Sequence, residues 1–492
     1  MTSYTFKYNL STLAVIRKKF WANAIKGKRL IFIFLLGTAL TTWAGCSPEI
    51  TESALPLDPP ESFGHSGNMP LQEEWWTGFE DQTLNMFVNE ALDSNFDLLA
   101  VWQRFRAAEA VVDRESSYLF PELEAFSVFG TSRPEPDFAG GENLRSGLSS
   151  VYEIDLWGRI RSRVKAEQYR AEASLYDYQA TAISLSAEIA RTWYQLLAEW
   201  QHLELAETQI ETNDKILRLF KSRFGSGQIR GVDILRQTQL MEATRGQKIL
   251  IESRIRILEH RFAVLIGAPP MEELIYAPDS FPALPPLPET GIPTELVQRR
   301  PDVRTAFSLL QVADREVASA ISAKYPRLSI SASVSSRANN VDDLFRDWAY
   351  SLGVNLVAPL FYGGRLSAEV DRAVAFKQQR LYEYGQTVLI AFREVEDALI
   401  QEMKQQERLQ VLEQQVKLAD QAYEQLRIEY FNGMSDYLAV LTAMDQAQQL
   451  QRELISERLA LLEFRIALYR ALAGGFETPA ENADRNEQMD EE

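Results

Sequence analysis

Few residues of this chain have the chemistry for catalysis or metal binding. The 492 residues include three histidines, His65, His202 and His260, and a single cysteine, Cys46. One cysteine excludes an internal disulfide and a zinc site built from thiolates. The wide spacing of the histidines argues against a histidine-rich metal site, and no nucleophile is paired with a general base. We therefore expect neither a cofactor nor enzymatic activity.

Cys46 stands where a lipid could be attached. Basic residues between Arg17 and Arg29 precede an apolar run from Leu30 to about Leu40, which is too short for a membrane anchor and has the order of a secretion signal. The run ends in TTWAGCSP, and the small residues before the cysteine resemble a bacterial lipoprotein cleavage site. Lipid on Cys46 would anchor the protein at a membrane surface. The alternative is an ordinary signal peptide with an incidental cysteine, because Trp43 replaces the usual leucine.

Serine residues mark a second feature, a strict alternation. The stretch LSISASVSS, Leu328–Ser336, alternates apolar residues with serine. Period two over this length predicts a strand with two unlike faces. The stretch Trp348–Leu356 alternates in the same way, with small or polar residues on one face. If these strands form part of a closed barrel, we expect their polar face to line its water-filled interior. The residues concerned are Ser329, Ser331, Ser333, Ser335, Ser351 and Asn355.

The overall composition is that of a folded, acidic protein. With 46% hydrophobic and 24% charged residues, the chain is long enough for more than one ordinary domain. Its formal net charge of −18, with no basic patch after residue 30, argues against nucleic acid as a partner. The last residues, 475–492, have no apolar stripe, and we expect a solvated, disordered tail.

The chain contains two copies of one unit. At a constant offset of 206, LWGR at 156–159 aligns with YGGR at 362–365, and Gly227 aligns with Gly433. A constant offset over such a length predicts a duplicated fold. The predicted divisions are a signal peptide at 1–45, an N-terminal lipidated periplasmic segment at 46–94, the first copy at 95–267, a proline-rich crossover at 268–299, the second copy at 300–474 and the tail at 475–492.

Each copy has the same predicted order of elements. A helix runs into a proline at Phe96–Tyr118 in the first copy and at Asp302–Lys324 in the second. Two strands joined by a loop follow, and then a long helix with a returning helix. The predicted strands and loops are Glu122–Gly130, Thr131–Ser146 and Leu148–Leu156 in the first copy, and Leu328–Ser336, Arg337–Asp347 and Trp348–Leu356 in the second.

The long helices indicate coiled-coil hairpins. The segment between Gly158 and Gly225 contains no glycine or proline, and as a helix it would extend about 100 Å. Each long helix turns at a glycine-bearing tip, FGSGQIRG or YFNGMSD. An ordinary bundle core explains the apolar stripe equally well, but not the length. The first copy places Asn213 within its stripe, and the stripe of the second copy is Leu409, Leu412, Val416, Ala419, Tyr423, Leu426 and Tyr430.

Four strands per chain have a consequence for membrane insertion. Strands of about nine residues cross a bilayer when they are tilted. Four strands cannot close a barrel, and an open edge in lipid leaves backbone groups without partners. Several chains must therefore share one sheet. Because small barrels fill their interior with side chains, a conducting barrel favours twelve or more strands, which leaves a trimer or a tetramer.

Five segments resemble the TolC-type outer-membrane efflux channels, in the lipoprotein branch that serves resistance–nodulation–division pumps. The similarity spans residues 70–475 in order. It implies a mainly α-helical homotrimer with a twelve-stranded transmembrane β-barrel in the outer membrane and an α-barrel of twelve helices in the periplasm. It also implies a periplasmic adaptor and an inner-membrane pump as partners. The segments are WWTGFEDQTLNMFVNEALDSNFDLLAV, YEIDLWGRIRSRV, GIPTELVQRRPDVRTA, VAPLFYGGRL and ALYRALAGG.

The resemblance also implies a gate at the hairpin tips. In this family the periplasmic end closes when inner hairpins, from the second repeat, are tied to outer ones. Tip-to-tip matching places the gate tyrosine at Tyr430 and its partner at Asp233, which predicts a hydrogen bond between them. Alternatively, Tyr430 is only the last residue of the stripe. Other gate positions hold Ser435, Ala439 and Thr442, so a charged gate stays open, with Asp436 and Asp445 as nearby substitutes.

The tips are also the expected adaptor contact, although their glycines equally serve a tight turn. The residues concerned are Gly227, Arg230, Gly231, Gly433 and Ser435. The function expected from the sequence is a passive exit duct for pumped small molecules (drugs, toxic compounds or metal ions), lipid-anchored in the outer membrane. The alternatives are a type I protein-secretion duct and a structural coiled-coil lipoprotein without a pore.

Overall fold

The computed structural model describes residues 57–131, 142–270, 280–338 and 341–472. The chain divides into two units, residues 1–51 and 52–492, and all described residues belong to the second. The predicted signal peptide, the lipid attachment at Cys46 and the acidic tail at 475–492 lie outside the described residues.

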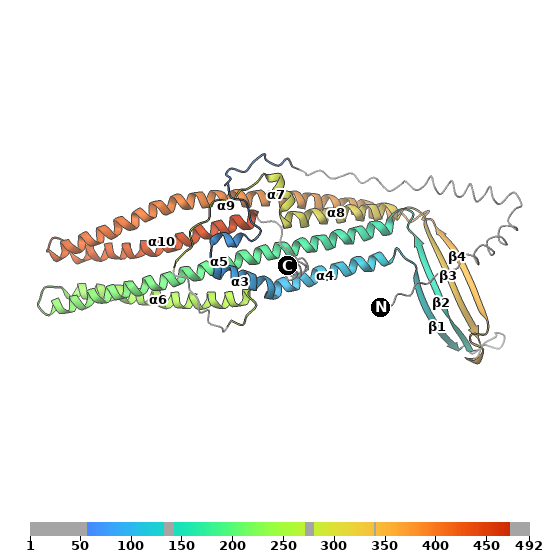
Figure 1. The fold of residues 1–492 in the computed structure, drawn as a ribbon, viewed down its shortest axis with the longest axis horizontal. Coiled ribbons are helices and arrows are strands. Elements are labelled where there is room, and N and C mark those ends of the chain that lie inside the picture. Colours follow the sequence, from blue (N-terminus) through green and yellow to red (C-terminus); the bar gives the residue numbers. More distant parts are fainter. Residues whose placement is uncertain (1–56, 132–141, 271–279, 339–340, 473–492) are drawn as a thin grey trace, which may run out of the picture. The chain divides into compact units, whose positions relative to one another are not determined.

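The same order of elements occurs twice along the chain (Figure 1). Each copy runs helix, strand, strand, long helix and returning helix, as the sequence predicts. The domain boundaries drawn above stay predictions. The first copy consists of α4 (Phe96–Ser117), β1 (Glu122–Thr131), β2 (Glu142–Ile154), α5 (Arg159–Phe224) and α6 (Gly231–Leu265), and the second of α8 (Pro301–Ser322), β3 (Arg327–Ala338), β4 (Trp348–Val357), α9 (Arg365–Phe431) and α10 (Tyr437–Leu472).

The long helices form the predicted hairpins, because α5 packs on α6 and α9 packs on α10. With 66 and 67 residues, α5 and α9 each extend about 100 Å. Tight tips end both helices, and Gly227 and Gly433 adopt φ of 73° and 75°, the left-handed region that favours glycine. The stripes face the helical core, which buries Ala206, Asn213, Leu217, Phe220, Leu409 and Leu412.

The four strands form one antiparallel sheet in the order β1-β2-β3-β4. β1, β3 and β4 agree with the predicted strands to within two residues at each end. The predicted loop Thr131–Ser146 is wrong at its C-terminal side, because β2 begins at Glu142. The reason is pairing: residues 142–147 have partners on β1, and residues 144–147 also on β3, so the ladder continues without a clean apolar alternation.

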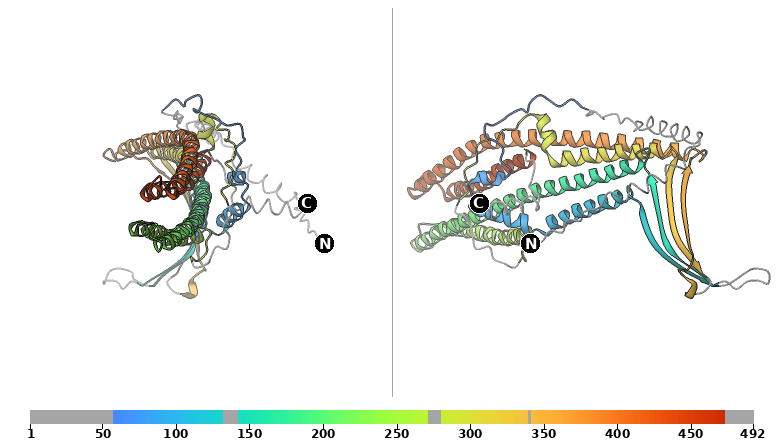
Figure 2. Two further views of the ribbon diagram at one scale, coloured as in Figure 1. Left: turned by 90° about the vertical axis from the view of Figure 1, so that its left-hand side faces the viewer. Right: turned by 45° about the vertical axis from the view of Figure 1, so that its right-hand side comes forward.

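Shorter elements pack on the middle of the helices. The helix α3 (Gln82–Ser94) and the 3₁₀ helix η1 (Trp75–Phe79), both drawn in blue in Figure 2, lie against α5 and α10. The short helix α7 (Pro293–Arg299) forms the last part of the crossover, and η2 (Val341–Asp343) lies between β3 and β4. The buried Arg465 joins the parts: it pairs with Glu402 on α9 and donates to the carbonyls of Pro285 and Pro286 in the crossover.

Candidate functional site: the sheet and the hairpin tips

The two faces of the sheet differ in charge. Cross-strand partners share a face, and the register runs without a bulge. We call the face with Ser329 the serine face and the face with Leu328 the apolar face. Among the strand side chains that the structure describes, every charged one lies on the serine face: Glu122, Glu124, Arg145, Glu153, Arg327 and Arg337.

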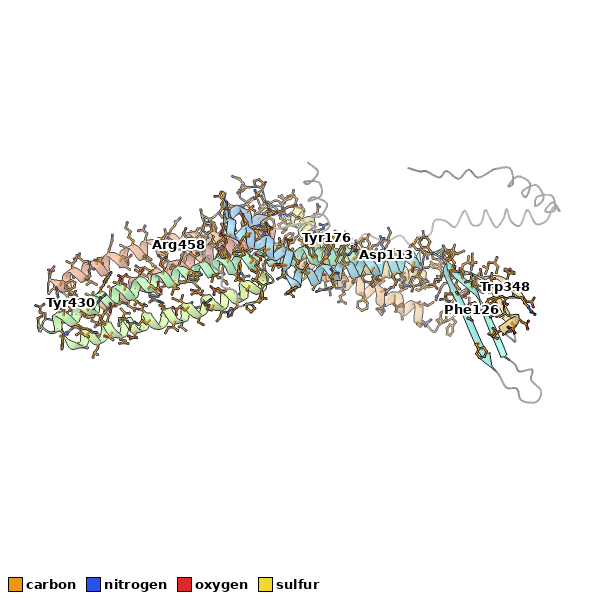
Figure 3. The ribbon with its side chains drawn as sticks, turned by 60° about the horizontal axis from the view of Figure 1, so that its bottom comes forward. Asp113, Phe126, Tyr176, Trp348, Tyr430 and Arg458 are labelled. Atoms are coloured by element: carbon orange, nitrogen blue, oxygen red, sulfur yellow. The ribbon has the colours of Figure 1, made fainter. Side chains whose placement is uncertain are left out.

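The six predicted interior residues share the serine face. Ser329 is paired with Asn355, and Ser333 with Ser351, whose hydroxyls lie 2.7 Å apart. The face is less uniform than the serine row alone indicates, since Phe126 of β1, labelled in Figure 3, lies on it as well. This face therefore combines small polar residues with charges and one large aromatic ring.

The apolar face carries the large aliphatic and aromatic side chains, among them Leu352 and Leu356, which are exposed in the single chain. Serines also lie on this face, and the hydroxyls of Ser127 and Ser146 lie 2.7 Å apart. Nearby, the Phe345 amide donates to Ser336 at 3.1 Å. These hydroxyls hydrogen-bond within the protein, as lipid requires of polar groups. Ser150 also lies on this face, between Leu123 and Ala332.

Two acidic residues connect the sheet to α5. Glu153, at the end of β2, receives both of its hydrogen bonds from Arg159, each 2.9 Å long. Asp155 accepts from the amides of Ile160 and Arg161, and so caps the first turn of α5. The strand thus passes into the long helix through a fixed junction.

At the other end of the long helices, an apolar cluster joins the two hairpins. Phe220 of α5 and Tyr437 of α10 are buried, with their ring centroids 4.6 Å apart at a steep angle. Tyr430 of α9, labelled in Figure 3, lies beside both rings, 6.1 Å and 5.5 Å away. Such edge-to-face contacts add to the burial of apolar area. The tips of one chain are therefore held together by aromatic packing.

Within the single chain, the described residues form no hydrogen bond between Tyr430 and Asp233, and the gate stays a prediction. Asp233 is buried, and both of its carboxylate oxygens accept from Arg230, at 3.1 and 3.2 Å. Arg230 binds Asp233 because it lies three residues earlier in the chain, and its planar guanidinium can donate to both oxygens of a carboxylate. Burial, and after it the charge of Asp233, raises the pKa of Tyr430. The two predicted partners are close enough to interact electrostatically.

A buried polar chain ties the hairpins instead. The Tyr437 hydroxyl donates to Oε1 of Gln237 on α6. The Gln237 amide donates to the backbone and side-chain oxygens of Asn213, at 3.2 and 3.1 Å, and Asn213 donates to Thr244 at 3.4 Å. Sequence reasoning missed this chain. Its signal was Asn213, a polar residue in an apolar stripe.

The tip residues differ in what they do. Asp436 accepts from the Ala439 amide at 2.9 Å, so it caps the first turn of α10. Asp233 raises the pKa of Arg230 on the other hairpin, and the charge of Asp436 adds a smaller effect in the same direction. Among the described residues, the Ser435 hydroxyl donates to the Asp436 carbonyl at 3.5 Å. Gly227, Arg230, Gly231 and Gly433 are exposed, as an adaptor contact requires.

In the part of the chain that the structure describes, no group of three or more His, Cys, Asp or Glu is arranged to hold a metal ion. No helix among the described residues combines the length and apolar character of a membrane span.

Comparison with known proteins identifies the family. The family described as outer membrane efflux protein matches residues 87–268 and 292–474. The chain belongs to the outer membrane efflux protein family. The two matched segments each contain one copy of the repeated element order.

Individual relatives agree with this membership. The pyoverdine export outer membrane protein OpmQ of Pseudomonas aeruginosa is 31% identical over 429 residues, which cover 84% of this chain and 90% of that protein. The toluene efflux pump outer membrane protein TtgI of Pseudomonas putida is 27% identical over 467 residues, which cover 89% of this chain and 97% of that protein. The outer-membrane channel OprN, a solved structure, has a TM-score of 0.80 at 28% identity, covering 86% and 98%. CusC, at 22% identity and a TM-score of 0.79, shares the fold.

These findings confirm the resemblance read from the sequence motifs. The protein is an outer-membrane efflux channel. Its helical hairpins and its four-stranded sheet are the two parts of that channel fold.

Proposed function

We propose that this efflux channel works as a homotrimer, in which three four-stranded sheets close one twelve-stranded barrel. The observation that carries the proposal is the open sheet with one face free of described charges: β1 and β4 each pair with one neighbour only among the described strands. Unpaired backbone groups cost several kcal/mol each in lipid, roughly. Further copies satisfy these edges. A barrel of about eight strands is filled by its own side chains, whereas a barrel of twelve strands leaves an open interior.

In this barrel the apolar face contacts lipid and the serine face lines the interior. The reason is the charge distribution, since an arginine or lysine on the lipid face costs about 2–4 kcal/mol at the bilayer centre. Six described charges lie on the serine face. The helices α5, α6, α9 and α10 of three chains form the α-barrel of twelve helices in the periplasm.

The partners in this proposal are a periplasmic adaptor, which contacts the hairpin tips, and an inner-membrane resistance–nodulation–division pump. The name of TtgI, an efflux pump outer membrane protein, supports the pump. The gate lies at the same tips, near Tyr430, Asp233 and Asp436. Cys46 carries a lipid that anchors the chain in the outer membrane, and no other cofactor or catalytic activity is required.

The cargo in this proposal is a small molecule that passes without chemical change. The names of relatives support this class, because OpmQ is named for pyoverdine and TtgI for toluene. A type I secretion duct would instead lose a secreted protein on deletion. A structural lipoprotein would form no pore.

The test is conductance of the purified protein in planar lipid bilayers, together with a susceptibility profile of a deletion strain. We expect stepwise ion conductance and increased sensitivity to organic compounds or metal ions. Absence of conductance would favour the structural lipoprotein. Labelling with palmitate in wild type and in Cys46→Ala tests the anchor, which equal labelling would exclude.

A further inference from the structure

Two arginines face each other at the far end of the sheet, where β2 begins and β3 ends. Arg145 of β2 and Arg337 of β3 are direct register partners, so both side chains lie on the serine face, next to Ser335. Both are exposed in the single chain. Like charges opposite one another destabilise a strand pair. Because this arginine pair destabilises the sheet, stability does not explain its presence, and a functional role does.

Neither guanidinium has a counter-charge in the described residues, since no carboxylate there lies within 4.0 Å of either one. The carboxylate that follows next along the serine face of β1 is Glu124, whose partner Ser149 lies four residues from Arg145. Four residues correspond to about 13 Å between the two backbone positions. Asp347, the residue before β4, lies at the same end of the sheet as Arg337, but it forms no ion pair within 4.0 Å with either guanidinium.

Phe126 fixes the orientation of one of the two arginines. Its register partner is Gly147, which has no side chain to displace the ring. The guanidinium carbon of Arg145 lies 5.2 Å from the centroid of the Phe126 ring. A cation over an aromatic face is held by the ring quadrupole, while its N–H groups remain free for an anion. The Arg145 side chain therefore leans along the serine face towards Phe126, which pairs with the residue two positions after Arg145.

We propose that Arg145 and Arg337 form a basic ring at the far end of the barrel, which selects small anions for passage. The inference rests on the proposed trimer, in which three such pairs surround the interior. A guanidinium fork binds a carboxylate or a similar anion through two hydrogen bonds. The ligand class is therefore small anionic solutes, and the ring concentrates them at the exit of the duct.

The test is ion selectivity in planar bilayers, measured as the reversal potential in a potassium chloride gradient. A unit charge about 7 Å from a passing ion in water contributes an energy close to thermal energy, which changes the local ion concentration about threefold. We expect the wild type to prefer chloride over potassium, and R145Q/R337Q to lower that preference at least about threefold. The matched control is R145K/R337K, which keeps both charges and should keep the preference.

Four results separate the possibilities. Unchanged selectivity in the glutamine variant would overturn the ring, while its conductance would leave the channel function intact. Loss of selectivity in the lysine variant would equally contradict a role for charge. A test in the wild type alone needs no variant to fold: raising the salt to about 1 M shortens the screening length to about 3 Å and should abolish the preference. A wild type without conductance would refute the proposed channel and the ring together.

Discussion

The hydroxyl of Tyr437 is the contact at the hairpin tips whose removal is most informative. It donates to Gln237 across the two hairpins of one chain, and both residues are buried, with 1% and 0% of their surfaces exposed. Tyr437→Phe deletes this donor and keeps the ring against Phe220. Packing is therefore preserved, and only the hydrogen bond is lost.

The expected cost follows from the environment of Gln237. Tyr437 is the one described donor to Oε1 of Gln237, and the Gln237 amide group is held in place by its bonds to Asn213. Loss of the Tyr437 hydroxyl therefore leaves Oε1 without a partner in a buried site. Such a group costs about 1–3 kcal/mol. Since about 1.4 kcal/mol is a factor of ten in an equilibrium, the separated state of the hairpin tips becomes about 5- to 150-fold more populated in each chain.

The assay is leakage of the channel, measured as conductance in planar bilayers and as entry of vancomycin into cells. We expect Tyr437→Phe to increase both. The control is Tyr430→Phe at the neighbouring ring, whose hydroxyl makes no hydrogen bond among the described residues, and it should resemble wild type. Increased leakage in Tyr430→Phe with none in Tyr437→Phe would refute this reasoning and restore Tyr430 as the gate residue.

Three further predictions address the sheet, the helices and the crossover. Leu352→Arg on the apolar face should prevent recovery of the protein in outer-membrane fractions, at about 2–4 kcal/mol per chain, whereas Ser331→Arg on the serine face should be tolerated. Burial, together with Arg254 and Arg452, lowers the pKa of His202 to about 4. Below pH 6.5 the unfolded chain therefore binds more protons than the folded chain. The contribution of neutral His202 to the free energy of unfolding is fully present above pH 6.5 and falls by about 1–2 kcal/mol towards pH 4. Melting curves of wild type and His202→Gln at several pH values check this. Glu402→Gln leaves Arg465 buried without its counter-charge, and the melting temperature should fall with a loss of about 3–5 kcal/mol.

The family, the repeat and the two-faced strands could be predicted from the sequence, because each rests on a local or periodic signal. An alternation of period two fixes which strand residues share a face, whatever the partner strand. All six predicted interior residues accordingly lie on one face. The start of β2 could not be predicted, since Glu142–Gly147 pairs through neighbours that the local pattern does not encode.

At the hairpin tips, the sequence predicted which residues lie close together but not which hydrogen bonds they form. Tip-to-tip matching placed Tyr430 and Asp233 near each other, and the charge of Asp233 does act on Tyr430. Which hydrogen bonds form there depends on competition. Arg230 satisfies Asp233, and Gln237 accepts from Tyr437.

The sequence by itself determined the long hairpins, the duplicated order of elements and the two unlike faces of the strands, because helix length and side-chain period are properties of neighbouring residues. Only the tertiary structure decided that Arg145 lies opposite Arg337 and that Tyr437 reaches Gln237. Both contacts join residues roughly 200 positions apart in the chain, and their geometry follows from strand register and helix packing. Those quantities are set by the fold as a whole.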